Sequence, residues 1–158
     1  MDKNKAVVEF IMSCPYIQNN PLFYNFGKAE ADNRQLVTLA NDVKTNQKFI
    51  DGSVKKKYTF TIIDYKSVSN VALTSRIGAT NENIEGAFEA QQLIDWVEEQ
   101  SKNRNYPDFG EDCTIDDMVV VTDQPNLNGI DKAVTPALAK YSISIRIDYI
   151  DYSEAIWR

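Results

Sequence analysis

The amino-acid sequence predicts an α+β fold with a mainly antiparallel sheet and two packed helices, in the order helix, strands, helix, two strands. Residues 139–150 alternate between large apolar and mostly polar side chains, the pattern of a strand with one face on a core and one on water. Residues 81–102 repeat apolar side chains at helical spacing. Asp51-Gly52 is a hairpin-turn pair between two β-rich runs. The 158 residues are expected to form a single domain, 1–158.

The beginning of the chain predicts one helix and two short strands. Residues 3–13 place apolar side chains at helical spacing, and Pro15 ends this amphipathic helix. Residues 22–26 are an aromatic strand candidate, and residues 35–40 are a second one.

A hairpin and a long strand follow. Asp51-Gly52 supplies the positive φ angles of a tight turn within residues 48–54, and the strand is expected over residues 55–68. Ile63 and Tyr65 make its second face apolar as well, so part of this strand is expected to be covered on both sides. Its first apolar face consists of Tyr58, Phe60 and Ile62.

The longest helix is expected over residues 81–102. Asn81 or Asn83 would cap it, and Gly86 costs about 1 kcal/mol relative to alanine if it is helical. Trp96 widens its apolar stripe. The stripe itself recurs at the helical period and consists of Ala90, Leu93, Ile94 and Val97.

The rest of the chain predicts loops around two strands. Residues 103–112 have the composition of a loop, and residues 117–122 are a short buried strand. Residues 123–136 contain Gln-Pro, Asn-Gly and Thr-Pro and are expected to form a turn-rich excursion before the terminal strand.

Composition argues against several classes of function. The net charge of −6 and the pI near 4.7 do not suit a nucleic-acid-binding surface, which needs lysine and arginine to neutralise phosphates. The sequence has no histidine, so it lacks the commonest general base and metal ligand. It has no apolar run of about 18 residues, and no membrane association is expected. We therefore expect a non-enzymatic protein without cofactor or metal, made in the cytoplasm.

One acidic segment could carry chemistry. Four carboxylates fall within seven residues and could bind a hard cation or act as an acid and base pair. The glycine and glutamate spacing of an EF-hand loop is missing, so a solvated acidic loop is the favoured interpretation. The four residues are Glu111, Asp112, Asp116 and Asp117.

Several short motifs follow the first helix in the order Asp51-Gly-Ser53, Lys57-Tyr-Thr-Phe-Thr-Ile62, Leu93-Ile-Asp-Trp-Val-Glu-Glu-Gln100, Asn103-x-Asn105-x-Pro107 and Tyr141-x-Ile-x-Ile-x-Arg146-x-x-Tyr149. With the first helix, their order over roughly residues 6–150 resembles the small minor-capsid or tail-completion proteins of tailed phages and prophages of Gram-positive bacteria. The long 123–136 excursion and the acidic balance depart from the family pattern and leave open which ring of the neck the chain would form.

The resemblance implies a structural protein of the virion tail or neck. Family members of this type resemble tail terminators, which form a ring, commonly of six copies, between the tail tube protein and the head-tail connector protein. Such a ring ends polymerisation of the tube, and DNA passes through its lumen without specific binding, which a negative charge would suit. The candidate contact residues are Asp51, Gly52, Ser53, Lys55, Lys56, Lys57, Asn126, Asn128, Asp131, Arg146 and Asp148.

Three other functions stay open at this point. One is another neck protein, such as a stopper or adaptor ring. A second is a small acidic regulator that binds a host protein through its sheet face. A third is an enzyme that uses the carboxylates near Asp112.

Overall fold

The protein folds as two helices and a seven-stranded, mostly antiparallel sheet among the residues that its computed structural model describes, which are 2–17, 21–27, 29–39, 46–69, 82–122, 124–131 and 137–156. This confirms the predicted α+β class. The elements in chain order are α1 (Lys3–Met12), β1 (Leu22–Tyr24), β2 (Arg34–Leu39), β3 (Gln47–Lys48), β4 (Val54–Ser67), α2 (Glu82–Lys102), β5 (Cys113–Val120), β6 (Asn126–Asp131) and β7 (Leu138–Asp151).

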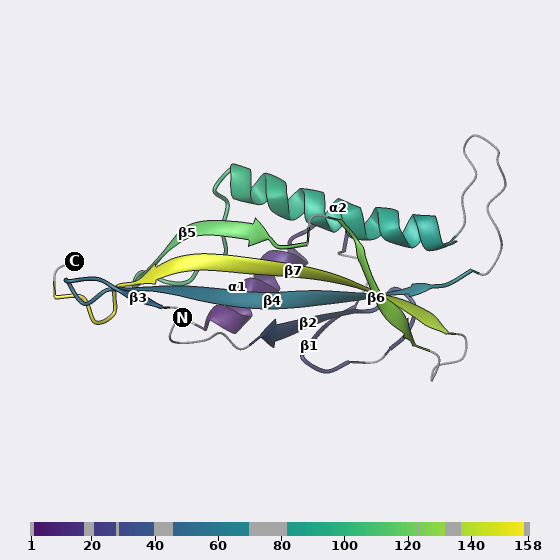
Figure 1. Ribbon diagram of the computed structural model, residues 1–158, viewed down its shortest axis with the longest axis horizontal. Helices are drawn as coiled ribbons and strands as arrows, with labels where there is room; N and C mark the ends of the chain where they lie inside the picture. The colour runs from purple at the N-terminus through teal and green to yellow at the C-terminus, as the bar shows by residue number, and fades with distance from the viewer. Residues whose placement is uncertain are drawn as a thin grey trace.

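The sheet is built on one long antiparallel pair, β4 and β7, which runs the length of the molecule (Figure 1). The pair keeps its register over 14 residues, from Val54 opposite Asp151 to Ser67 opposite Leu138. Strands β2 and β3 pair with the other edge of β4, β5 and β6 pair with the other edge of β7, and β1 lies parallel to β2. Each end of the pair therefore has its own set of flanking strands.

Both helices pack on the same face of this sheet, and α1 lies behind β4 and β7 in Figure 1. Alternation along the two strands puts Phe60 opposite Ile145 and Ile62 opposite Ile143, and all four side chains are fully buried. The helices contribute the buried side chains of Ala6, Val7, Phe10, Ile11, Ala90, Leu93, Ile94 and Val97. This apolar layer is the core of the protein.

Helix α1 begins and ends as its sequence predicts. The Asp2 carboxylate accepts a hydrogen bond from the backbone N–H of Asn4 at 2.9 Å, which caps the first turn. At the other end, Cys14 is buried just before Pro15. The centroid of the Phe10 ring lies 5.1 Å from that of the half-buried Trp96 ring on α2, so the two helices are in contact through aromatic side chains.

Helix α2 confirms the predicted apolar stripe but not the Asn83 cap. Asn83 lies inside the helix, and its side chain bonds instead to the backbone N–H and carbonyl of Ser69. The alternative cap, Asn81, and the connection 70–80 before it lie outside the described residues.

Strand β5 is longer than predicted and includes part of the segment expected to be an acidic loop. The prediction of a strand over 117–122 missed a β-bulge at Asp116, which shifts the register between Ile115 and Asp117. With one extra residue, Ile115 and Met118 both face the core although they are three positions apart. A pattern of period two cannot show such an insertion.

Among the residues described after α2 there are three strands, not two. Residues 126–131, expected to lie in a turn-rich excursion, form β6, which pairs with the first half of β7. A second bulge falls between Leu127 and Gly129. Asn-Gly is a strong turn signal, but here Gly129 has a φ of 148° within a strand, where the bulge uses its conformational freedom.

Candidate interaction surfaces

The predicted hairpin turn forms one end of the molecule. Gly52 has a φ of 92°, and the carboxylate of Asp51 accepts hydrogen bonds from the backbone N–H of Ser53 at 2.9 Å and from its hydroxyl at 2.6 Å. These bonds to Ser53 lower the pKa of Asp51. A Cβ on Gly52 would lie 2.7 Å from the carbonyl oxygen of Glu154, so the turn packs closely on the C-terminal segment.

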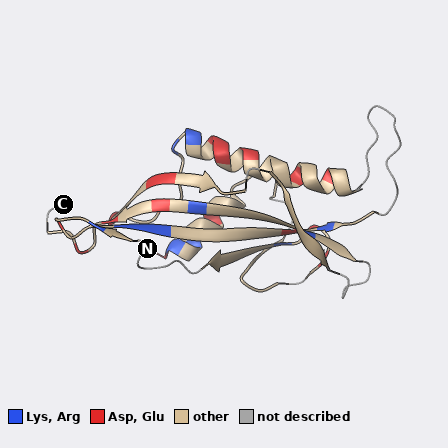
Figure 2. Ribbon diagram, viewed as in Figure 1, with Lys and Arg blue, Asp and Glu red and all other residues tan. Residues whose placement is uncertain are grey.

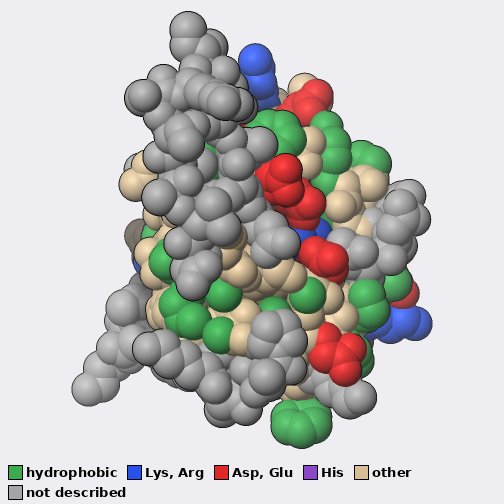
Figure 3. Space-filling model, turned by 90° about the vertical axis from the view of Figure 1, so that its right-hand side faces the viewer, with side chains coloured by type: hydrophobic (Ala, Val, Ile, Leu, Met, Phe, Trp, Pro, Cys, Tyr) green, Lys and Arg blue, Asp and Glu red, His purple; other side chains and the backbone are tan. Residues whose placement is uncertain are grey.

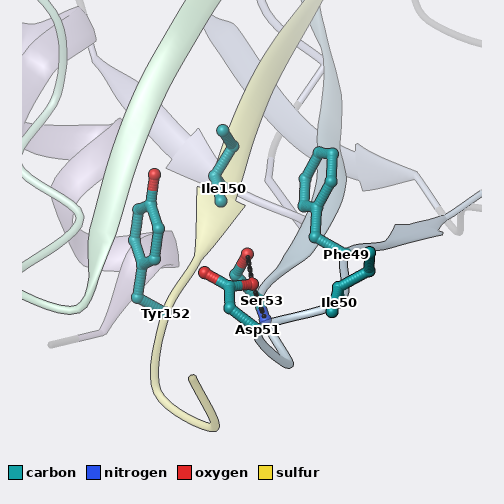
Figure 4. Close-up of a pocket in the computed structure, with 6 residues that line it drawn as sticks. All are labelled: Phe49, Ile50, Asp51, Ser53, Ile150 and Tyr152. Atoms are coloured by element: carbon teal, nitrogen blue, oxygen red, sulfur yellow. Dashed lines mark hydrogen bonds between the residues drawn. The ribbon is translucent and has the colours of Figure 1, made fainter. Parts of the chain in front are cut away.

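An open apolar groove of about 500 Å³ lies beside this turn (Figure 4). The Phe49 and Tyr152 rings flank Ile150, and the Asp51–Ser53 pair lies below it. The Ile50 side chain is 100% exposed. Sequence analysis identified the polar turn but missed these apolar neighbours. We call Phe49, Ile50, Ile150 and Tyr152 the tip surface.

The three consecutive lysines among the predicted contact residues do not form one patch, because successive residues of a strand point to opposite faces. Lys56 lies on the helix side, where its ammonium is 2.8 Å from the Asp151 carboxylate. Burial alone would raise the pKa of Asp151, but hydrogen bonds from Lys56 and Ser153 outweigh burial and hold it below its usual value. Lys55 and Lys57 lie on the opposite, outer face of the sheet.

The outer face also carries the predicted pair Arg146 and Asp148, whose side chains bond to each other at 3.0 Å. Lys55 reaches across β7 to Asp116 at 3.0 Å. That contact is the main cause of its raised pKa. Figure 2 shows the resulting order of charge: basic on β4, mixed on β7 and acidic on β5.

At its centre the outer face carries small polar and β-branched side chains, whereas toward the end away from the tip its side chains Tyr65 and Leu138 are buried. Thr61 and Ser144 face each other with hydroxyl oxygens 3.0 Å apart. No described helix lies over this face, since α1 and α2 both pack on the other one. The side chains at its centre, which the strand registers place in adjacent rows, are Val37, Thr59, Thr61, Ser144 and Val119.

The remaining predicted contact residues lie on β6, at the end of the molecule opposite the tip surface (Figure 1). Asn126 pairs with Ser142, and Asn128 occupies the bulge. Asp131 is the last residue of the strand, and its side chain lies outside the described set. These three residues of β6 belong to a paired strand and not to a loop, so their backbone groups contribute to the sheet.

A buried cluster of charges lies where β4 ends, and sequence analysis did not predict it. Arg34 and Asp64 sit opposite each other on β2 and β4, with 3.3 Å between guanidinium and carboxylate. The Lys66 side chain is only 5% exposed and makes ion pairs with Asp32, at 3.0 Å, and with Glu89. Figure 3 shows acidic side chains gathered on this end of the molecule.

Burial and charge oppose each other in this cluster. Burial raises the pKa of Asp64 to about 6 although Arg34 and Lys66 both favour its ionised form. For Lys66 burial favours the neutral amine, but Asp64, Glu89 and Asp32 together outweigh burial and raise its pKa. Lys66 is therefore a buried cation held by carboxylates from three segments of the chain.

Gly86 is the residue of α2 that lets the helix approach Lys66. A Cβ at this position would lie 3.1 Å from Cγ of Lys66, 3.2 Å from its Cβ and 3.4 Å from the Tyr141 ring. This packing explains a glycine that by its intrinsic preference would weaken the helix.

Within the described residues, no group of three or more histidine, cysteine, aspartate or glutamate side chains is arranged to hold a metal ion. The four carboxylates of the predicted acidic segment are divided between a turn and β5: Glu111 and Asp112 precede the strand, whereas Asp116 and Asp117 lie on its outer face. None of the described helices has the length and apolar character needed to cross a membrane.

Comparison of the chain with models of known protein families gives no match. A search of curated proteins gives no significant match either.

Proposed function

We propose that the protein is a tail terminator of a tailed phage or prophage. It would form a ring, of six copies as is common in the family it resembles, that caps the tail tube, stops its polymerisation and joins it to the head connector. The resemblance of the sequence motifs supports this proposal, and the structure adds an independent reason.

The observation that carries the proposal is the separation of the contact surfaces. The tip surface and β6 lie at opposite ends of the β4–β7 pair (Figure 1). A ring between two partners must contact the tube on one side and the connector on the other. An elongated subunit with one surface at each end suits that position.

The outer face supports the ring itself. Each copy in a closed ring offers its neighbours two different surfaces. The outer face, with Arg146, Asp148 and its β-branched centre, would supply one of them, and the helix-covered side would supply the other. A stopper or adaptor ring would need the same kinds of contact surface. The identity of the partner bound at each end would therefore distinguish a tail terminator from these other rings of the neck.

The tip surface gives the direct test. The double variant Phe49→Ser with Ile50→Ser should fold normally, because Ile50 is fully exposed and Phe49 is 36% exposed. It should fail either to cap tail tubes or to join capped tails to heads, as seen by electron microscopy of the assembly mixture. The matched control is Phe26→Ser, a position after β1 that is 89% exposed and lies outside the tip surface, both helices and β6. Normal capping and joining by the double variant would contradict the proposal.

A further inference from the structure

The outer face of the sheet carries an ordered distribution of charge. Reading across the strands at one level, Lys57 on β4 lies beside Asp148 on β7, which lies beside Asp117 on β5. At the next level toward the tip, Lys55 on β4 lies beside Ile150 on β7 and reaches the bulge residue Asp116 on β5. Positive charge thus lies on one side of β7 and negative charge on the other.

The bulge in β5 makes this order possible. Without the extra residue, alternation would turn one of the two consecutive aspartates toward the core. With it, both Asp116 and Asp117 project from the outer face, and both are exposed. Lys57 is exposed on the other side of β7.

This arrangement is complementary to itself. A two-fold axis that runs along β7, in the plane of the contact, places β4 of one copy over β5 of the other. Lys57 of each copy then faces Asp117 of the other, and Lys55 faces the partner's edge at Asp116. Arg146 and Asp148 lie on the axis, where their own ion pair neutralises them.

The centre of the face fits the same contact. The axis puts Thr59 of one copy over Val119 of the other, and Thr61 over Val121, which is 55% exposed. These are β-branched side chains with no formal charge, which can interdigitate between two sheets about 10 Å apart. The contact would cover apolar surface as well as pair charges.

We infer that the protein forms a face-to-face dimer through its outer sheet face, with a second copy as the occupant. The inference rests on the self-complementary charges and does not depend on the proposed phage function. The axis overlays three strands, β4, β7 and β5, over the length that β5 shares with β7. Strand rise and spacing make this contact about 26 Å by about 14 Å, on the order of 400 Å² per copy. That is below the usual size of a specific complex, so a weak dimer with a dissociation constant on the order of 100 μM is expected.

Charge reversal provides the test. Wild-type protein between about 1 and about 200 μM should show a monomer–dimer equilibrium in sedimentation velocity, weakened by added salt. Lys57→Glu and Asp117→Lys, each alone, should weaken the dimer at least tenfold, because each places like charges opposite each other twice. An equimolar mixture of the two variants should dimerise again, and so should the double variant Lys57→Glu with Asp117→Lys.

Further variants separate the contact from effects on folding. Lys102→Glu and Asp108→Lys make the same changes in net charge at exposed positions outside the outer face and should leave the dimer intact. Val121→Glu should weaken the dimer by placing a charge near the centre of the contact, while Lys57 and Asp117 stay unchanged. Circular dichroism establishes that each variant is folded.

Two results would overturn the inference. One is a wild-type protein that stays monomeric over the whole concentration range. The other is an oligomer of any size that neither single reversal weakens. A larger oligomer that shows the same weakening and rescue would support the contact between outer faces.

Discussion

At the scale of single residues, the most informative feature is the buried cation Lys66. Its ammonium is held by carboxylates of Asp32 and Glu89, and Gly86 gives the space that its aliphatic stem occupies. Removing one partner of a buried ionic cluster costs several kcal/mol, because the remaining charge is left without compensation. Close packing of α2 and the charges of this end of the sheet therefore depend on each other.

Replacing Gly86 by alanine tests this dependence. Alanine favours an exposed helix by about 1 kcal/mol over glycine, but overpacking a tight site costs about 1 to 3 kcal/mol. We expect Gly86→Ala to lower the free energy of unfolding by about 1 kcal/mol in urea denaturation. Glu98→Gly, at an exposed position of the same helix, measures the propensity of glycine alone. A Gly86→Ala variant more stable than wild type would show that the Lys66 side chain moves aside at little cost in free energy.

The buried carboxyl of Asp64 predicts a pH dependence. Its pKa of about 6 in the folded protein lies above the ordinary 3.8, so the folded state keeps a proton that the unfolded state has already released. The stability that this proton contributes is present at low pH and is lost as the pH rises through about 6. The difference in unfolding free energy, wild type minus Asp64→Asn, should therefore fall by on the order of 2 kcal/mol between about pH 4 and pH 7. A difference that grows with pH would mean that the ion pairs outweigh burial.

At the scale of elements, the two β-bulges explain where sequence reasoning succeeded and where it failed. The helices and the long strands β4 and β7 were predicted within one or two residues, because their apolar side chains keep one period from end to end. Strands β5 and β6 break that period with an inserted residue, so one was shortened and the other was taken for a loop. The buried charge cluster could not be predicted, because its members come from segments far apart in the chain.

Deleting the bulge residue is a direct test of the register of β5. Without Asp116, Ile115 and Met118 would be two positions apart and would still both face the core, so the chain should fold and lack only the ion pair with Lys55. Deleting Val119 instead turns the buried Val120 toward the outer face and should cost about 2 kcal/mol or more. The melting temperatures of the two deletion variants and of wild type measure these effects. Equal destabilisation by the two deletions would contradict a bulge at Asp116.

At the scale of the whole molecule, the ring and the face-to-face dimer compete for the same surface. The proposed ring would use the outer face for a heterologous contact, whereas the dimer would pair it with itself. If both form, the free dimer covers the outer face until a tube end offers a stronger contact. Lys57→Glu should then increase ring formation without tubes, measured as the fraction of ring particles in electron micrographs. Fewer rings than wild type would show that Lys57 is also needed for the contact between subunits of the ring.

The sequence limits what could be known of function at this scale. The tip surface combines Phe49 and Ile50 with Ile150 and Tyr152, which are about a hundred positions away in the chain, so only the folded protein shows it. By contrast, the hairpin turn beside it was visible in the sequence, because Asp-Gly has a strong local preference. The separation of the tip surface from β6 likewise follows from strand order, which no local pattern reveals.

The central claim is that the protein caps a tail tube as a ring, and electron microscopy of the protein added to tubes assembled from the tail tube protein of the same phage or prophage tests it most directly. We expect a ring with a central hole at one end of each tube, and tubes that stop growing once it is bound. Tubes that keep growing with bare ends, together with no ring at any protein concentration, would contradict the claim.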